Sequence, residues 1–150
     1  HGSTAQGARG FPNLTDDEWL YGGSPAQIEQ SILSGRAGVM PPLNAVFATD
    51  EALEEMVRYV QAMPDGMDTS SPAHSQYMTL CIACHGPTGA GVQALGAPSL
   101  VDDVWLYGSS PAETRKSIVE GRIGEMPAHA NLIGPDRARI LTAYVYSLSQ

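Results

Sequence analysis

The pattern of hydrophobic and polar positions along the chain is helical, without the convincing alternation that marks a strand. Ser24-Pro25 and Ser110-Pro111 each have the form of a helix N-cap followed by a proline in the first turn. The sequence therefore predicts an all-α protein. Its helices are expected over about 24–35, 50–62, 74–83, 110–121 and 135–149.

The last predicted helix carries apolar side chains at helical spacing, which are expected to form its buried face. These side chains are Ile140, Leu141, Tyr144, Val145 and Leu148. Tyr77 and Met78, in the helix predicted over 74–83, are expected to pack against this terminal helix.

The chain repeats itself after about 85 residues. PNLTDDEWLYGGSPA at 12–26 and PSLVDDVWLYGSSPA at 98–112 agree at 11 of 15 positions. His1-Gly2 corresponds to His85-Gly86 once two extra residues in the second copy are allowed for. The match extends through Gly-Arg at 35 and 121, Met-Pro at 40 and 126, and Tyr-Val at 59 and 144.

The repeat predicts two small domains joined by an irregular linker rich in Pro, Gly, Ser and Thr. The expected boundaries are 1–63 for the first domain, 64–72 for the linker and 73–150 for the second domain. A helix is predicted before CIACHG in the second copy, and nothing precedes His1 in the first. The first domain is therefore expected to lack its N-terminal helix here.

The composition and charge of the chain limit the classes of function that it can have. The formal net charge of −8 argues against nucleic acid, whose phosphates would be repelled. An acidic surface would either steer a basic protein partner or serve only to keep the protein in solution. Sixteen glycines and eleven prolines indicate many loops, and small loop-rich units usually need a cofactor for stability. No apolar run reaches the ~20 residues that span a bilayer. Any anchoring segment is expected upstream of His1.

The candidate chemistry lies in CIACHG at 81–86, which holds the only two cysteines. A thioredoxin-like CxxC would be expected in a βαβ context, and a structural zinc site needs two further ligands, commonly a second such pair. C-x-x-C-H is the haem c attachment motif, in which two thiols bind the haem vinyl groups and the histidine ligates iron. The motif therefore predicts covalent haem c at Cys81 and Cys84, with His85 as an axial ligand.

Two methionines are candidates for the other axial position. Met126 follows His85 by 41 residues, and Met40 follows His1 by 39 residues. Each precedes a proline, which stiffens its loop. The sequence pairs His85 with Met126 and His1 with Met40. His/Met ligation raises the haem potential and fills both axial positions, so it predicts electron transfer without bond-making chemistry.

Besides the tandem repeat, the chain contains the motifs CIACHG, LGAPSL, DDVWLYG, GRIGEMPAH and AYVYSL. With these features the chain resembles, over essentially its whole length, subunit III of the cbb3-type cytochrome c oxidases. The resemblance implies two tandem class I cytochrome c domains and two haems c in the intact protein. It also implies a membrane-anchored dihaem subunit on the periplasmic side of the bacterial inner membrane, not catalytic by itself. Electrons would pass from the bc complex or a small cytochrome c to the monohaem and haem-copper subunits.

Carried onto this sequence, the resemblance implies roles for further residues. Pro98 and Pro12 would accept a hydrogen bond from the histidine ring through their carbonyls. The candidates for contact with the haem propionates are Trp105, Trp19, Arg122 and Arg36, with Tyr107 and Tyr21 beside them. A core role for the aromatic residues, and a helix-capping role for the arginines, are the alternatives.

Three other interpretations remain open. A free soluble dihaem cytochrome c would differ only in lacking a membrane segment upstream. A dihaem peroxidase or haem sensor would need one open or bis-His iron, and the matched Met-Pro loops count against it. A chain-initial histidine can also form part of a copper brace, although the alignment of His1 with His85 explains His1 better.

Overall fold

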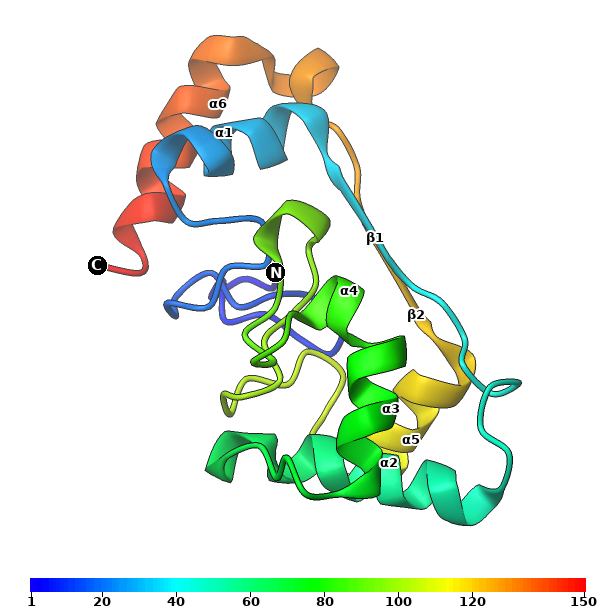
Figure 1. The fold of residues 1–150 in the computed structure, drawn as a ribbon. Helices are drawn as coiled ribbons and strands as arrows, with labels where there is room; N and C mark the ends of the chain where they lie inside the picture. The colour runs from blue at the N-terminus through cyan, green and yellow to red at the C-terminus, as the bar shows by residue number, and fades with distance from the viewer. The chain divides into compact units, whose positions relative to one another are not determined.

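The computed structural model describes all 150 residues, and most of its regular structure is helical (Figure 1). The elements, in chain order, are α1 (Pro25–Ser34), β1 (Arg36–Met40), α2 (Asp50–Ala62), η1 (Met63–Asp65), α3 (Pro72–Leu80), α4 (Ile82–His85), η2 (Gln93–Leu95), α5 (Pro111–Glu120), β2 (Arg122–Met126) and α6 (Ala130–Ser147). None of these helices combines the length and the apolar character needed to cross a bilayer.

The predicted helix starts are found where the caps were expected. The Ser24 side chain accepts a hydrogen bond from the Gln27 N–H, and the Gln27 side chain returns to the Ser24 backbone, which makes a capping box. Ser110 caps α5 in the same way through the Glu113 N–H. α6 contains Gly134, whose dihedral angles are not helical, so its regular part starts at Pro135.

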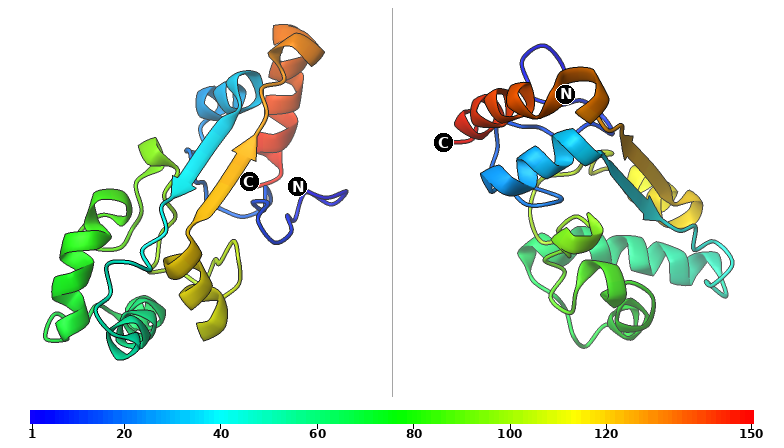
Figure 2. Two further views of the ribbon diagram at one scale, coloured as in Figure 1. Left: turned by 90° about the vertical axis from the view of Figure 1, so that its right-hand side faces the viewer. Right: turned by 90° about the horizontal axis from the view of Figure 1, so that it is seen from above.

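The expectation of no strands was wrong. β1 and β2 pair into a two-stranded sheet, and their arrows point in opposite directions (Figure 2). Their sequences, RAGVM and RIGEM, are five residues long and have glycine at the centre. Such segments show too few apolar positions to reveal a period of two. They form strands because each supplies the other with backbone hydrogen-bond partners.

The compact units do not follow the predicted boundaries of 1–63, 64–72 and 73–150. Unit 1 consists of 1–38 and 123–150, and unit 2 consists of 39–122. Each unit thus combines the first half of one sequence copy with the second half of the other. The predicted boundaries describe the repeat in the sequence, whereas the chain crosses between the units at β1 and again at β2.

The core of unit 2 lies where α2 packs against α3 and α5. Met56, Met63 and Tyr77 are almost completely buried in it. The Tyr59 and Tyr77 rings lie 6.0 Å apart, and the Tyr59 hydroxyl lies 2.7 Å from His74 Nδ1. Tyr77 therefore packs against α2 and not against the terminal helix, which corrects the sequence expectation. The partner expected for that helix, Met78, is 38% exposed.

The core of unit 1 lies between α1 and α6 (Figure 1). It is formed by Ile28, Ile32, Ala138 and Val145, and Thr142 is buried beside them. The expected buried face of α6 was therefore wrong in part. Ile140, Leu141 and Tyr144 are exposed, and Leu148 is half-buried.

The repeat explains this difference. Leu141 and Tyr144 correspond to Met56 and Tyr59 of α2, which α3 covers in unit 2. Unit 1 contains no helix before α1, so the same face of α6 stays open to solvent in this chain.

Tyr77 should make the stability of unit 2 sensitive to alkaline pH. Its hydroxyl donates to the Gly86 carbonyl at 2.7 Å, and burial raises the pKa of Tyr77 to about 12, with Cys81 and Tyr59 adding to the shift. The unfolded chain releases this proton near pH 10.0, so the unfolded state holds fewer protons between about pH 10 and about 12. The free energy of unfolding should fall with rising pH across that window.

Denaturant unfolding of the Tyr77→Phe variant tests this expectation. The variant should lose stability at neutral pH by about 1–3 kcal/mol, because the Gly86 carbonyl loses its buried donor, and should show a shallower alkaline decline. Tyr144→Phe, at a 59% exposed position, should retain the steep decline. Equal alkaline slopes in the wild type and Tyr77→Phe would contradict the assignment.

Candidate haem-binding sites

The two thiols and His85 lie on one turn of backbone. α3 ends at Leu80, and α4 begins immediately after Cys81. The backbone N–H groups of Cys84 and His85 both donate to the Cys81 carbonyl, at 3.1 and 2.9 Å. Because of this turn, Cys84 and His85 lie in a single short helix whose N-cap is Cys81.

His85 is held in a defined orientation. It is 8% exposed, and its Nδ1 lies 2.9 Å from the Pro98 carbonyl oxygen. A carbonyl can only accept, so Nδ1 carries the proton and Nε2 keeps its lone pair. Burial lowers the pKa of His85, against a smaller opposing effect of the Pro98 carbonyl, so the imidazole stays neutral. A neutral ring with a free Nε2 is the form that ligates iron.

The two cysteines do not have the properties of a redox pair. Both are free and half-buried. Burial, with a smaller effect of Cys84, raises the pKa of the Cys81 thiol to about 11. Redox-active CxxC motifs work in the opposite way, by lowering the pKa of the attacking thiol. No group of three or more His, Cys, Asp or Glu side chains converges in the chain, so a zinc tetrahedron has no complete set of protein ligands here.

The structure repeats the histidine loop at the start of the chain. His1 Nδ1 lies 2.7 Å from the Pro12 carbonyl oxygen, as His85 does from Pro98. The His1 carbonyl accepts from the Gly7 N–H at 2.9 Å, and the His85 carbonyl accepts from the Gly91 N–H at the same distance. His1 and His85 therefore correspond in their structure as well as in the sequence, although no cysteine accompanies His1.

The donor set at 81–85 fits haem c. It offers two free thiols three positions apart and one oriented neutral imidazole, which are the groups that the CxxCH motif contributes. When bound, the haem supplies a one-electron redox centre. Cys81 and Cys84 would hold its vinyl carbons, and His85 would ligate its iron.

The two candidate methionines lie in different units from those that the sequence pairing requires. Met40 is in unit 2, together with His85 and both cysteines. Met126 is in unit 1, together with His1. Both methionines are half-buried and pack against the core of their own unit. The predicted partners His85 and Met126 therefore belong to different compact units.

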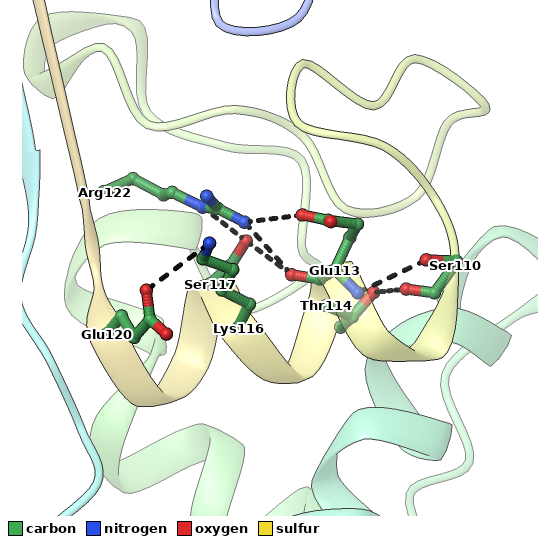
Figure 3. A network of polar contacts seen from close by, with 7 residues as sticks. All are labelled: Ser110, Glu113, Thr114, Lys116, Ser117, Glu120 and Arg122. Atoms are coloured by element: carbon green, nitrogen blue, oxygen red, sulfur yellow. Dashed lines mark hydrogen bonds and ion pairs between the residues drawn. The ribbon is translucent and has the colours of Figure 1, made fainter.

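Arg122 is fixed onto α5 by a polar network (Figure 3). Its Nε donates to the Ser117 hydroxyl at 2.9 Å, and its Nη2 lies 3.2 Å from both the carbonyl and the carboxylate of Glu113. The guanidinium also lies 4.4 Å from the centre of the Tyr107 ring. These contacts anchor Arg122 along α5 through Glu113 and Ser117. A role in capping the helix end at Gly121 and contact with a propionate both stay predictions.

Arg36, the first residue of β1, contacts α1 as Arg122 contacts α5. It donates to the Ser31 hydroxyl at 2.8 Å and lies 4.8 Å from the centre of the Tyr21 ring. Gln27 replaces Glu113 in this copy, so the Arg36 guanidinium has a backbone carbonyl but no carboxylate at that point. Trp105 and Trp19 are half-buried, each against the core of its own unit. The two sites share their geometry and differ in local charge.

Sequence reasoning missed Tyr77 as part of the site. Its hydroxyl fixes the Gly86 carbonyl, directly after the axial histidine. A tyrosine at this position is not marked by any period or motif, and the first copy contains no equivalent to reveal it. His74, expected at the surface, is instead half-buried against Tyr59, and His129 has a buried Nδ1 without a hydrogen-bond partner.

The sequence of the chain matches a known protein family and several curated proteins. The family described as cytochrome c oxidase, cbb3-type, subunit III matches residues 1–60 and 68–145. Subunit CcoP from Rubrivivax gelatinosus is 40% identical, across 100% of this chain and 50% of its own length. Subunit FixP from Bradyrhizobium diazoefficiens is 39% identical, across 99% and 56%. CcoP from Cereibacter sphaeroides is 34% identical, across 99% and 56%.

The chain thus spans about half the length of the curated relatives it matches. The matched family covers both copies of the repeat, including the CIACHG turn and both methionine loops. Because this family model matches most of the chain, the chain belongs to the family of cbb3-type cytochrome c oxidase subunit III.

Proposed function

We propose that this chain is the electron-relay part of a cbb3-type oxidase, with two tandem cytochrome c units of class I type. The observation that carries the proposal is the CIACHG turn, in which Pro98 orients His85 and leaves Nε2 available beside two free thiols. A second haem would be ligated by His1, and its covalent attachment would need two cysteines close to that histidine. The unit with Cys81 and Cys84 carries its haem covalently.

The residues of unit 2 define what the protein contributes to electron transfer. His85 and a methionine would ligate the iron, and the thioether ligand would favour the ferrous state and raise the potential. Tyr77 holds the backbone after His85 through the Gly86 carbonyl, so the histidine is fixed by two hydrogen-bonded neighbours. A rigid site needs little rearrangement when the charge of the iron changes. With a histidine and a methionine both bound to the iron, the protein would transfer electrons and would bind no substrate there.

The proposed setting follows the family. The unit would work on the periplasmic side of the bacterial inner membrane, next to the monohaem and haem-copper subunits. It would accept electrons from the bc complex or a small cytochrome c. The net charge of −8 supports a basic donor, because opposite charge speeds the encounter of two proteins at low salt.

Carbon monoxide binding to the reduced, haem-loaded chain at neutral pH tests the proposal. Six-coordinate His/Met iron should bind little or no carbon monoxide within seconds, while a five-coordinate haem protein run in parallel should bind it completely. Rapid and complete binding by this chain would contradict the electron-relay function and favour a sensor or peroxidase.

A further inference from the structure

We infer that Glu113 lowers the potential of the haem on the CIACHG motif, because it holds Arg122 in place and offsets the positive charge of that arginine. The inference rests on the proposed function, since it assumes that this haem is attached and carries electrons. Glu113 is a positioning residue in this account. It acts through Arg122 and through its own charge, without contact with the iron.

The two copies of the repeat hold their arginines in the same way, apart from one acceptor. Arg36 and Arg122 each donate through Nε to a serine hydroxyl of the preceding helix, at 2.8 and 2.9 Å. Each guanidinium also lies over a tyrosine ring. The Nη2 atoms donate to the backbone carbonyls of Gln27 and Glu113, at 3.4 and 3.2 Å. The two arginines therefore differ in the side chain at this last position.

That side chain is a neutral amide in the first copy and a carboxylate in the second. The Gln27 amide oxygen accepts from the Ser24 N–H at 3.1 Å, so it serves the start of the helix. The Glu113 carboxylate lies 3.2 Å from Arg122 Nη2 and forms an ion pair with it (Figure 3). The repeat thus places a negative charge beside its arginine in unit 2 and has no carboxylate at this point in unit 1.

The ion pair between Glu113 and Arg122 is largely shielded from water. Their side chains are 25% and 16% exposed. The other ion pair within α5 joins Lys116 to Glu120, whose side chain is 62% exposed. Water and salt screen a charge less when the charge is withdrawn from solvent. A change of charge at Glu113 should therefore be felt further into unit 2 than the same change at Glu120.

The ion pair lies in the part of the protein that holds the haem motif. Unit 2 contains CIACHG as well as Glu113 and Arg122. Between these two charged residues, Ile118 of α5 is buried in the core against which Cys81 packs. A domain of about 100 residues has a radius of gyration of only about 13 Å. A shielded charge in unit 2 should therefore act on the iron over a distance on the order of 10 to 15 Å.

The sign of the effect follows from the charge of the iron. Ferric iron carries one more positive charge than ferrous iron, so a nearby carboxylate favours the ferric state and a nearby guanidinium favours the ferrous state. Glu113 and Arg122 largely offset each other, and removal of the carboxylate should raise the potential. At an effective dielectric constant of about 20, one charge at this distance changes the equilibrium constant for reduction by about three- to tenfold, or about 30–60 mV.

Redox titration of the haem-loaded chain, followed by absorbance, tests the inference. Glu113→Gln removes the charge and keeps the size of the side chain, and the first copy already has glutamine at the equivalent position of α1. At equilibrium with a fixed mediator, the ratio of reduced to oxidised haem should be about three- to tenfold higher than in the wild type. Glu113→Ala, a second uncharged variant, should shift the potential in the same direction.

Two control variants separate the charge of Glu113 from its packing. Glu113→Asp keeps the negative charge, so the ratio should stay within about twofold of the wild type. Glu120→Gln makes the same charge change at an exposed position of the same helix, and its ratio should stay within the same limit of about twofold.

A shift in Glu113→Gln that is no larger than in Glu120→Gln, or that lowers the potential, would overturn the role of Glu113 and leave the proposed function intact. An equal shift in Glu113→Asp would overturn it as well, because a change of packing would then be the cause. A wild-type chain that matures without covalent haem would contradict the proposed function itself.

Discussion

Replacing Cys81 and Cys84 together by alanine is expected to reduce covalent haem from one per chain to none. The two thiols are the only cysteines of the chain, and each would form one thioether to the haem. Without them the haem could be held only through its axial ligands and packing. Intact mass of the purified chain should then match the bare polypeptide, and acidified organic solvent should extract any haem that remains.

The single variant Cys81→Ala provides the matched control. It keeps the thiol of Cys84 next to His85, so it should retain one thioether and a haem that resists extraction, with a visible spectrum shifted to the red. Covalent haem in the double variant would mean that attachment occurs elsewhere. That outcome would contradict the role given to CIACHG.

Tyr59→Ala is expected to destabilise unit 2 by about 3–5 kcal/mol, the range measured for removal of a large buried aromatic side chain. Tyr59 is 6% exposed, its ring lies 6.0 Å from that of Tyr77, and its hydroxyl lies 2.7 Å from His74. The truncation would leave a cavity between α2 and α3 as well as an unpaired imidazole nitrogen. Urea unfolding, followed by haem absorbance, reports this unit because the haem motif lies within it.

The repeat supplies the control at the equivalent position. Tyr144 occupies the same place in α6 and is 59% exposed, so Tyr144→Ala should change the free energy of unfolding by no more than about 0.5 kcal/mol. Equal losses in the two variants would contradict the structure, because they would mean that both copies bury this tyrosine.

Local structure could be predicted from the sequence where local chemistry decides it. Ser24-Pro25 and Ser110-Pro111 marked the helix starts because a hydroxyl cap and an N1 proline satisfy the first turn without tertiary help. The CIACHG motif could be interpreted for a similar reason, because its residue types and spacing alone mark a haem c attachment site. The strands were not, because RAGVM and RIGEM owe their conformation to each other and not to their own pattern.

The division of the chain into its two compact units could not be predicted, because the two copies of the repeat are so similar that the sequence does not tell which halves pack together. Gly35 and Gly121 are equivalent, and so are Met40 and Met126, so the sequence satisfies closure within a copy and exchange between copies equally well. Tyr77 was consequently expected against α6, whereas it packs against α2. The expected burial of Leu141 and Tyr144 was wrong for a related reason. They are apolar like the equivalent residues of α2, but only in unit 2 does another helix, α3, cover that face.

The central claim is that this chain is a c-type cytochrome whose haem is attached at Cys81 and Cys84. Its most direct test is the intact mass of the wild-type chain from a host with cytochrome c maturation, combined with a pyridine haemochrome spectrum. The account predicts the polypeptide mass plus one haem, and a haemochrome of the type given by two thioether bonds. A chain of unmodified mass without a haemochrome, folded and recovered from that host, would contradict it.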